Sequence, residues 1–275
     1  MIRVGTRGSA LALAQASFVG DRLGADYELV TISAAGPVGD KSRWVSELER
    51  ALLEGEIDVA VHSAKDVPAE LPDGLELVAF PEREDPRDAI CGAVSALKDL
   101  PAGARVGTSS LRRAAQIRAV RSDVQVLDVR GNVDTRLRKL AEGECDALVL
   151  AVAGLRRLGL GFDGVLDELV PAAGQGALAL EARPGAVDVD RVSDPVTTAC
   201  VLAEREVTRA LGASCNTPVG AWAQMVDGGE LELSAWVGRA DGSAWISDRL
   251  RGPAAGLGAR VAERLLSAGA AELLS

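Results

Sequence analysis

Short apolar runs alternate with helix-like segments along much of the chain, and this alternation constrains the fold more than any other feature. The run Ile57–His62 is apolar and β-branched, as is typical of a strand buried on both faces. Helical spacing precedes it in Ser9–Leu23 and in Trp44–Glu54. Strands that alternate with helices predict an α/β fold with mostly parallel sheets. The expected strands are 2–5, 27–33, 57–62, 105–107, 124–129 and 147–152, and the apolar run 177–182 could join either sheet.

The alternation falls into two units and then stops. The charged, proline-containing stretch Glu82–Asp88 separates the first unit from the second, which continues with expected helices over 110–120 and 132–141. From about residue 195 the pattern changes to a long helix, a Gly/Ser/Cys turn, two strands and a final Ala/Leu helix. The sequence therefore predicts two α/β lobes followed by a small α+β module.

The charge balance excludes general binding to polyanions. Thirty basic residues stand against forty acidic residues, a formal net charge of −10, so the surface repels nucleic acid and anionic lipid. Four of the basic residues are lysines and 26 are arginines, whose planar guanidinium binds a carboxylate or phosphate through two hydrogen bonds. We therefore expect small anionic ligands, and no nucleic-acid or membrane partner.

Cysteine and histidine content argues against a metal site. The four cysteines are far apart in the sequence and His62 is the single histidine, so neither a zinc site nor a disulfide framework is expected. The N-terminal residues lack a basic region followed by an apolar core, and no apolar run could span a bilayer. These features predict a cytoplasmic protein, and nothing requires more than a monomer.

Arginines concentrate at two expected strand-to-helix turns. Eight arginines and three aspartates lie between Arg105 and Arg138. The segments Gly107–Arg113 and Arg130–Arg136 each enter a helix, where free backbone N–H groups favour an anion. A similar turn, Gly5–Ser9, enters the helix that carries Gln15. We interpret these turns as a binding site for a ligand with several carboxylates or phosphates; the alternative is two capped helices with solvated faces.

Two further segments carry reactive side chains. Asp66 follows the buried strand, where a carboxylate could act as acid or base or stabilise a cation, although the segment could also be a structural turn. Cys215 lies in a loop of small residues that a ligand could reach, although free cysteines are most often buried. The Gly-rich segment Gly159–Gly164 follows a helix-like segment instead of a strand, which argues against a dinucleotide site.

Six motifs in order resemble the porphobilinogen deaminase family, also called the hydroxymethylbilane synthases. They are His62–Pro68, Glu82–Asp88, Gly107–Arg113, Arg130–Asn132 with Thr135–Arg136, Ala151–Leu155 and Gly174–Ala177. The resemblance covers essentially the whole chain. It implies two lobes that resemble those of periplasmic binding proteins, with a cleft between them, and a third domain that carries the cofactor cysteine. The implied domains are 1–84 with 177–194, 87–173, and 197–275.

The resemblance also implies the reaction. Members of the family join four porphobilinogen molecules head to tail on a dipyrromethane primer, release ammonia at each step, and free a linear tetrapyrrole by hydrolysis in haem biosynthesis. The primer is held through a thioether to a cysteine that corresponds to Cys215. Asp66 matches the catalytic carboxylate, which would stabilise the cationic azafulvene left when ammonia departs and help to move protons.

Further positions match family residues that bind the carboxylates of the pyrroles. The cofactor-binding set implied is Ser63, Lys65, Thr108, Ser109, Arg112, Arg113, Arg130, Gly131 and Asn132, and the substrate-binding set is Arg7, Ser9, Gln15, Arg136 and Arg157. No metal is implied. The chain differs from the family in having Ala213 and Ser214 before the cysteine, where two glycines are usual, and in a short lid segment at Ala34–Trp44 that contains Lys41. A non-catalytic anion-binding protein and an inactive deaminase are the competing hypotheses.

Overall fold

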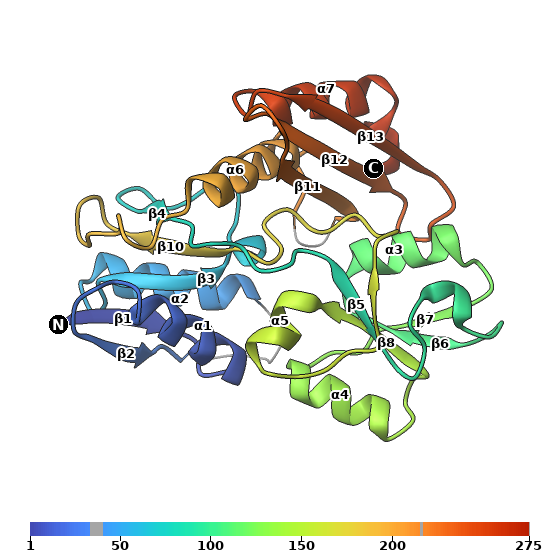
Figure 1. Cartoon of the computed structure of the whole chain (residues 1–275), viewed down its shortest axis with the longest axis horizontal. Helices are drawn as coiled ribbons and strands as arrows, with labels where there is room; N and C mark the ends of the chain where they lie inside the picture. The colour runs from blue at the N-terminus through green and yellow to red at the C-terminus, as the bar shows by residue number, and fades with distance from the viewer. Residues whose placement is uncertain (34–40, 215–216, 275) are drawn as a thin grey trace. The chain divides into compact units, whose positions relative to one another are not determined.

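The chain folds into two units in a computed structural model that describes residues 1–33, 41–214 and 217–274 (Figure 1). Unit 1 consists of Met1–Glu84 and Gly176–Thr198, and unit 2 of Asp85–Gln175 and Ala199–Ser275. Unit 2 contains both the second α/β lobe and the C-terminal module. The expectation that this module is a separate third domain stays a prediction.

Unit 1 is a five-stranded sheet in the order β2-β1-β3-β10-β4. Helices α1 and α2 cover its two faces: Ala16 and Val19 of α1 pack in one apolar cluster, and Leu48 and Leu52 of α2 pack in another. The elements are β1 (Ile2–Thr6), α1 (Ala10–Gly20), β2 (Tyr27–Thr31), α2 (Lys41–Leu53), β3 (Val59–Ser63), the 3₁₀ turn η1 (Ala64–Asp66), β4 (Glu76–Ala79) and β10 (Leu178–Ala182).

The lobe of unit 2 has the corresponding order β7-β6-β8-β5-β9. Ile117 of α3 packs on one face, and Leu155 of α5 packs on the other beside Leu137 and Leu140 of α4. The elements are β5 (Asp88–Cys91), the 3₁₀ turn η2 (Leu97–Asp99), β6 (Arg105–Gly107), α3 (Leu111–Val120), β7 (Gln125–Leu127), α4 (Val133–Ala141), β8 (Ala147–Ala151), α5 (Val152–Arg157) and β9 (Gly164–Leu166).

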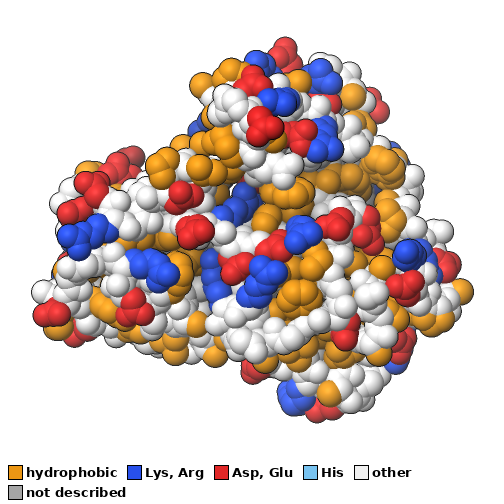
Figure 2. Space-filling model, viewed as in Figure 1, with side chains coloured by type: hydrophobic (Ala, Val, Ile, Leu, Met, Phe, Trp, Pro, Cys, Tyr) orange, Lys and Arg blue, Asp and Glu red, His pale blue; other side chains and the backbone are white. Residues whose placement is uncertain are grey.

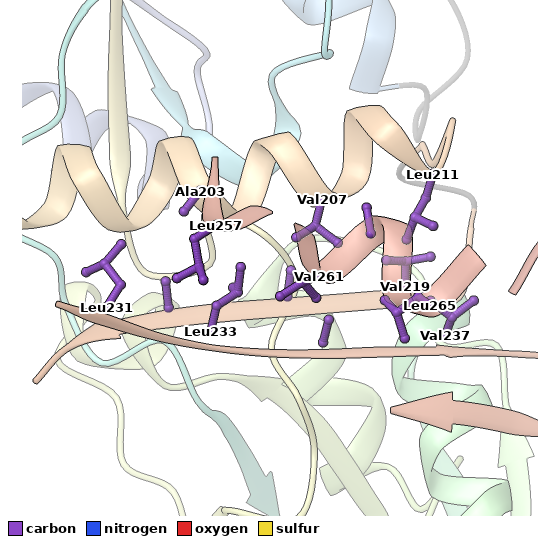
Figure 3. Packing of buried hydrophobic residues seen from close by; sticks show 14 of the residues in the cluster. Ala203, Val207, Leu211, Val219, Leu231, Leu233, Val237, Leu257, Val261 and Leu265 are labelled. Carbon is purple, nitrogen blue, oxygen red and sulfur yellow. The ribbon is translucent and has the colours of Figure 1, made fainter. Parts of the chain in front are cut away.

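The C-terminal module is a three-stranded antiparallel sheet covered by helices. Val207 and Leu211 of α6, Val261 and Leu265 of α7, and Leu233 of the sheet belong to one apolar cluster (Figure 3). The elements are α6 (Pro195–Ala210, which begins in unit 1), β11 (Val219–Met225), β12 (Leu231–Gly238), β13 (Trp245–Gly252), α7 (Leu257–Ser267) and α8 (Ala270–Leu274). Two α/β lobes and a small α+β module confirm the predicted fold class.

The two sheets are mixed, which corrects the expectation of mostly parallel sheets. In each sheet the first three strands pair in parallel, and the two remaining pairings are antiparallel. β10 enters the first sheet after the chain has passed through the second lobe, and β5 enters the second sheet from unit 1. Strands that arrive from another unit need no helical crossover, so they are free to run in either direction.

Both lobes contain the same arginine–aspartate clasp at the start of the sheet. The backbone N–H and guanidinium of Arg3 donate to Asp58, with Nη2 2.6 Å from Oδ1, and those of Arg105 donate to Asp146 with the same separation. The first clasp joins β1 to the residue before β3, and the second joins β6 to the residue before β8. Figure 2 shows such acidic and basic side chains interspersed on the visible face.

At Gly164, β9 packs closely against the loop before η2. A Cβ atom built on Gly164 would lie 1.9 Å from the carbonyl oxygen of Ser95, whereas one on Gly161 would meet nothing within 4 Å. We expect Gly164→Ala to lower the free energy of unfolding by about 1–3 kcal/mol because the backbone must move. Gly161→Ala should change it by less than about 1 kcal/mol. Urea unfolding followed by circular dichroism measures both variants, and equal stabilities would contradict this packing.

Candidate active site

The turn that carries Asp66 is formed directly by the end of a buried strand. Val59, Ala60 and Val61 of β3 are buried, and the strand leads into η1, which contains Lys65 and Asp66. Val67 is buried in turn, and the Pro68 that follows keeps Val67 in the extended conformation with ψ near 127°. The apolar residues on either side therefore fix the position at which the half-buried Asp66 leaves the sheet.

A small pocket in unit 1 brings together four of the site residues expected from the sequence: Asp66, Arg7, Gln15 and Ser63. The pocket has a volume of about 10 Å³, which is room for about one water molecule. The side-chain amide of Gln15 donates to the Ser63 hydroxyl at 3.1 Å. The lining residues are Arg7, Ala12, Gln15, Val45, Leu48, Val61, His62, Ser63 and Asp66.

Ser9 and Lys65 are close in the sequence to residues that line this pocket, but they do not line it themselves. Ser9 is the N-cap of α1, and its hydroxyl accepts a hydrogen bond from the backbone N–H of Ala12 at 3.3 Å. Such a cap stabilises the helix that carries Gln15. The side chain of Ser9 therefore has a structural role here, and its predicted contact with substrate stays a prediction.

In unit 2, Arg112 and Arg113 are buried around a single carboxylate. Arg112 Nη2 lies 2.8 Å from Oδ2 of Asp88, and Arg113 Nε lies 2.9 Å from Oδ1. Gln175 also donates to Oδ1 at 2.7 Å, and Asp88 is completely buried. Arg113 makes a further hydrogen bond to the carbonyl of Val149. The two arginines thus bring two positive charges into the protein against one negative charge.

The electrostatics of this group reflect that imbalance. Burial acts to raise the pKa of Asp88, but the charges of Arg112 and Arg113 outweigh it and hold the pKa well below its usual range. Burial lowers the pKa of Arg112, and the like charge of Arg113 lowers it further against the attraction of Asp88. Arg112 Nε is buried without a hydrogen-bond partner among the described residues. A buried donor of this kind favours an additional acceptor.

Arg130 and Arg136 add positive charge at the next turn. Arg136 is half-buried and donates to the carbonyl of Gly131 at 2.7 Å, while the exposed Arg130 pairs with Asp128 at 2.8 Å. The pKa of Arg136 is lowered by burial and then by the charges of Arg113 and Arg130, with Asp128 opposing them. The guanidinium groups of Arg113 and Arg130 therefore lie close enough to Arg136 to lower its pKa. The combined positive field of the three groups favours an anion.

The backbone of this turn requires glycine. Gly131 has a φ of +123°, and a Cβ atom there would lie 2.8 Å from Thr135. Asn132 is the N-cap of α4 in an extended conformation and makes no side-chain capping bond to the helix. The Asn132 amide is therefore not engaged by the helix that it precedes.

The remaining predicted residues of unit 2 lie at the ends of neighbouring elements. Thr108 is buried after β6 and accepts from the backbone N–H of Ser110 at 3.2 Å, and Ser109 between them is half-buried. Arg157 is the half-buried last residue of α5. Cys215 and the segment 34–40 lie outside the described residues, as do the side chains of Lys41–Trp44.

Several arginines counted with the basic cluster have other partners. Arg105 pairs with Asp146, Arg121 with Asp123 and Arg138 with Glu142. Their charges are neutralised locally, so only part of the basic cluster contributes to an anion site. The residue count overestimated the positive charge available to bind an anion, because a sequence does not show which arginines are paired with a carboxylate.

Sequence reasoning did not identify Asp88, Gln175, Glu49 or Glu181 as parts of a site. A fully buried acidic residue inside the apolar run Leu178–Ala182 was the available signal for Glu181. Cys91, Cys145 and Cys200 are buried, and burial raises the pKa of Cys91 to about 11. In the described ranges, no group of histidine, cysteine and acidic residues could hold a metal ion, and no helix could cross a membrane.

Comparison with protein families matches nearly the whole chain. Residues 2–191 match the family model "Porphobilinogen deaminase, dipyromethane cofactor binding domain", and residues 198–267 match "Porphobilinogen deaminase, C-terminal domain". Among solved structures, a nutrient binding protein from Burkholderia cenocepacia bound to methionine is similar over 66% of this chain and 85% of its own, at 12% identity and a TM-score of 0.40.

Curated relatives agree with the family models. A porphobilinogen deaminase from Thiobacillus denitrificans is 46% identical, with 99% of this chain and 97% of that protein covered. The porphobilinogen deaminase from Thermus thermophilus is also 46% identical, with 100% and 98% covered. Identity at this level over full length, together with both domain matches, shows that this chain belongs to the porphobilinogen deaminase family.

Proposed function

We propose that the chain is a hydroxymethylbilane synthase, an enzyme of tetrapyrrole and haem biosynthesis. It joins four porphobilinogen molecules head to tail on a covalently attached dipyrromethane, releases ammonia at each addition, and frees the linear tetrapyrrole by hydrolysis. The observation that carries this proposal is the pocket that unites Asp66 with Arg7, Gln15 and Ser63 in a chain of this family. We further propose that it acts in the cytoplasm as a monomer, without a nucleic-acid or membrane partner.

The arginines of unit 2 are suited to bind the carboxylates of the dipyrromethane. Its acetate and propionate groups require several cationic donors, and Arg112 presents a buried Nε without a partner in the described chain. Arg130 and Arg136 add charge beside Arg113. The proposed holding set is Ser63, Lys65, Thr108, Ser109, Arg112, Arg113, Arg130, Gly131 and Asn132, with Cys215 forming the thioether. When bound, the dipyrromethane supplies the pyrrole α-carbon to which the first substrate is joined.

The arginines select the substrate by its charge. Porphobilinogen carries two carboxylates, and a guanidinium can donate two parallel hydrogen bonds to each of them. Arg7, Ser9, Gln15, Arg136 and Arg157 form the proposed substrate-binding set. An acidic exterior with local guanidinium sites repels larger polyanions by its net charge of −10 while it binds small carboxylates locally.

Asp66 carries out the central chemical task. Its carboxylate accepts hydrogen bonds from pyrrole N–H groups and stabilises the positive charge that develops on the substrate when ammonia leaves. An oriented, half-buried carboxylate interacts with such a cation more strongly than one that is fully exposed to water. Asp66 then accepts the proton that the pyrrole α-carbon loses when the new carbon–carbon bond forms.

The first prediction concerns the attachment residue. Purified protein should have an intact mass greater than that of the polypeptide by two linked pyrroles, and Cys215→Ser should lack this excess. Cys200→Ser removes a buried cysteine in α6 and should retain it. Intact-mass spectrometry measures all three proteins. An unmodified wild type from a host supplied with porphobilinogen would support the non-catalytic binding protein instead.

The second prediction concerns Asp66. Asp66→Asn keeps the size and hydrogen-bonding ability of the side chain but removes its charge, so turnover should fall by about 10²- to 10⁴-fold while porphobilinogen still binds. The exposed Asp73→Asn serves as a control with unchanged turnover. Steady-state formation of the tetrapyrrole measures kcat, and isothermal titration measures binding. Full activity in Asp66→Asn rejects its role, and an inactive wild type would indicate the degenerate deaminase.

The third prediction uses two arginines of one helix. Arg136→Leu should raise the KM for porphobilinogen by about ten- to hundredfold, since a charged hydrogen bond contributes about 1.5–3 kcal/mol. Arg138→Leu removes an exposed arginine of α4 that pairs with Glu142, and should leave the KM unchanged. Equal KM values in both variants would remove Arg136 from the binding set.

A further inference from the structure

Three buried titratable side chains lie on the α2 side of the sheet in unit 1. His62 is on β3, Glu181 on the neighbouring β10 and Glu49 on α2. Their exposed fractions are 6%, 0% and 7%. Two carboxyl groups and the single imidazole of the chain are thus withdrawn from water in one place, which is costly unless they exchange charge or protons with one another.

Glu181 and His62 are close, but their geometry is not that of a completed hydrogen bond. His62 Nε2 lies 2.9 Å from Oε2 of Glu181. His62 Nε2 and both carboxylate oxygens nevertheless have no hydrogen-bond partner among the described residues. A carboxylate buried without a donor is costly, and the imidazole of His62 is the group that faces Glu181. The facing nitrogen and oxygen atoms are therefore close enough for one proton to lie between them.

The residue that carries this imidazole also lines the proposed reaction site. His62 lines the pocket that Asp66 also lines, and that pocket has a volume of about 10 Å³. A cavity of this size holds about one water molecule when polar groups border it. Asp66, Ser63 and Arg7 provide polar groups there. A single water between Asp66 and His62 would therefore connect the reacting carboxyl group with the buried pair.

We propose that His62 is a positioning residue that receives the proton of Asp66 through one water molecule and so restores the Asp66 carboxylate after each addition, with Glu181 stabilising the imidazolium. This inference rests on the proposed function. An imidazole is suited to the task because it exchanges protons near neutral pH. Glu181 is suited to it because no other described donor competes for its oxygens.

The proton balance of each addition is closed. The carbon–nitrogen bond of the protonated substrate aminomethyl group breaks, its electron pair leaves with ammonia, and one carbon–carbon bond forms between the methylene carbon and a pyrrole α-carbon. That α-carbon loses a proton to Asp66, which passes it through the water to His62. The imidazolium then releases the proton to solvent, where ammonia takes it up as ammonium. No oxidant or reductant is needed.

Charged groups from four elements surround His62. Glu181 faces it from β10, Glu49 from α2, Asp66 from η1 and Arg7 from the loop after β1. Burial raises the pKa of Glu49, and the charge of Glu181 raises it further while His62 lowers it. Glu49 therefore takes up a proton more readily than an ordinary glutamate, which leaves Glu181 as the partner of the imidazolium.

The test compares His62→Gln with wild type in the full chain. Glutamine can hydrogen-bond in the pocket but cannot accept a proton, so kcat should fall about 10²-fold. The KM for porphobilinogen and the intact mass should not change. The pH dependence of kcat between pH 5 and 8 should flatten. The control is Glu47→Gln, which alters α2, the helix that carries Glu49, at its exposed pair with Arg50 and should leave kcat, KM and the pH profile unchanged.

Glu181→Gln is the second variant, in case His62→Gln does not fold. Without the carboxylate the imidazolium loses its stabilisation, so the pH profile of kcat should move to lower pH while the KM stays constant. Wild-type kcat and pH profiles in both folded variants would overturn the inference even if wild type makes the tetrapyrrole. A wild type that makes no tetrapyrrole overturns the proposed function instead, so the two failures are distinguishable.

Discussion

The buried interaction of Asp88 with two arginines is the constraint on which unit 2 depends. Asp88 is the first residue of β5, the strand that the chain reaches directly after leaving unit 1. Arg112, Arg113 and Gln175 converge on it from α3 and from the segment before β10. Removing one partner from such a group leaves a charge buried without compensation, which typically costs 3–5 kcal/mol. The same contacts that hold the lobe together thus keep guanidinium charge beside the proposed ligand site.

The two units bury acidic groups in opposite ways. Both oxygens of Asp88 accept hydrogen bonds, and the surrounding positive charge keeps the carboxylate ionised. Glu181 is equally buried but accepts no hydrogen bond from the described residues, and its neighbours are His62 and a second glutamate. A fully satisfied carboxylate fixes charge permanently, whereas an unsatisfied one beside an imidazole can gain and lose a proton. The first arrangement suits binding, and the second suits proton transfer.

Much of the fold was predictable because apolar composition identifies the three parallel strands of each lobe in the sequence. Ile57–His62 became β3, and the polar turn after it became η1 with Asp66. The antiparallel strands β5 and β9 were missed because each is short and follows a charged or glycine-rich segment. Pairing between strands from distant parts of the chain leaves no local periodicity. The strand order shared by the two lobes was also missed, although Arg-Val-Gly-Thr occurs at both 3–6 and 105–108, and Gly-Glu-x-Asp at both 55–58 and 143–146, where the Arg3–Asp58 and Arg105–Asp146 pairs form.

The candidate site was predictable only where a residue type has one common use. The strand-end position of Asp66 suggested chemistry, and the pocket around it bears residues that the family resemblance had named. Arginines gave a weaker signal, because the same residue type has different surroundings at different positions. Arg105 pairs with Asp146 at a strand end, Arg113 binds the buried Asp88, and Arg130 is exposed. Only the three-dimensional neighbours separate these uses. Several of the 26 arginines pair with a carboxylate, so the informative arginines are those whose positive neighbours outnumber their acidic ones. Arg136, acted on by Arg113 and Arg130 against Asp128 alone, meets that condition.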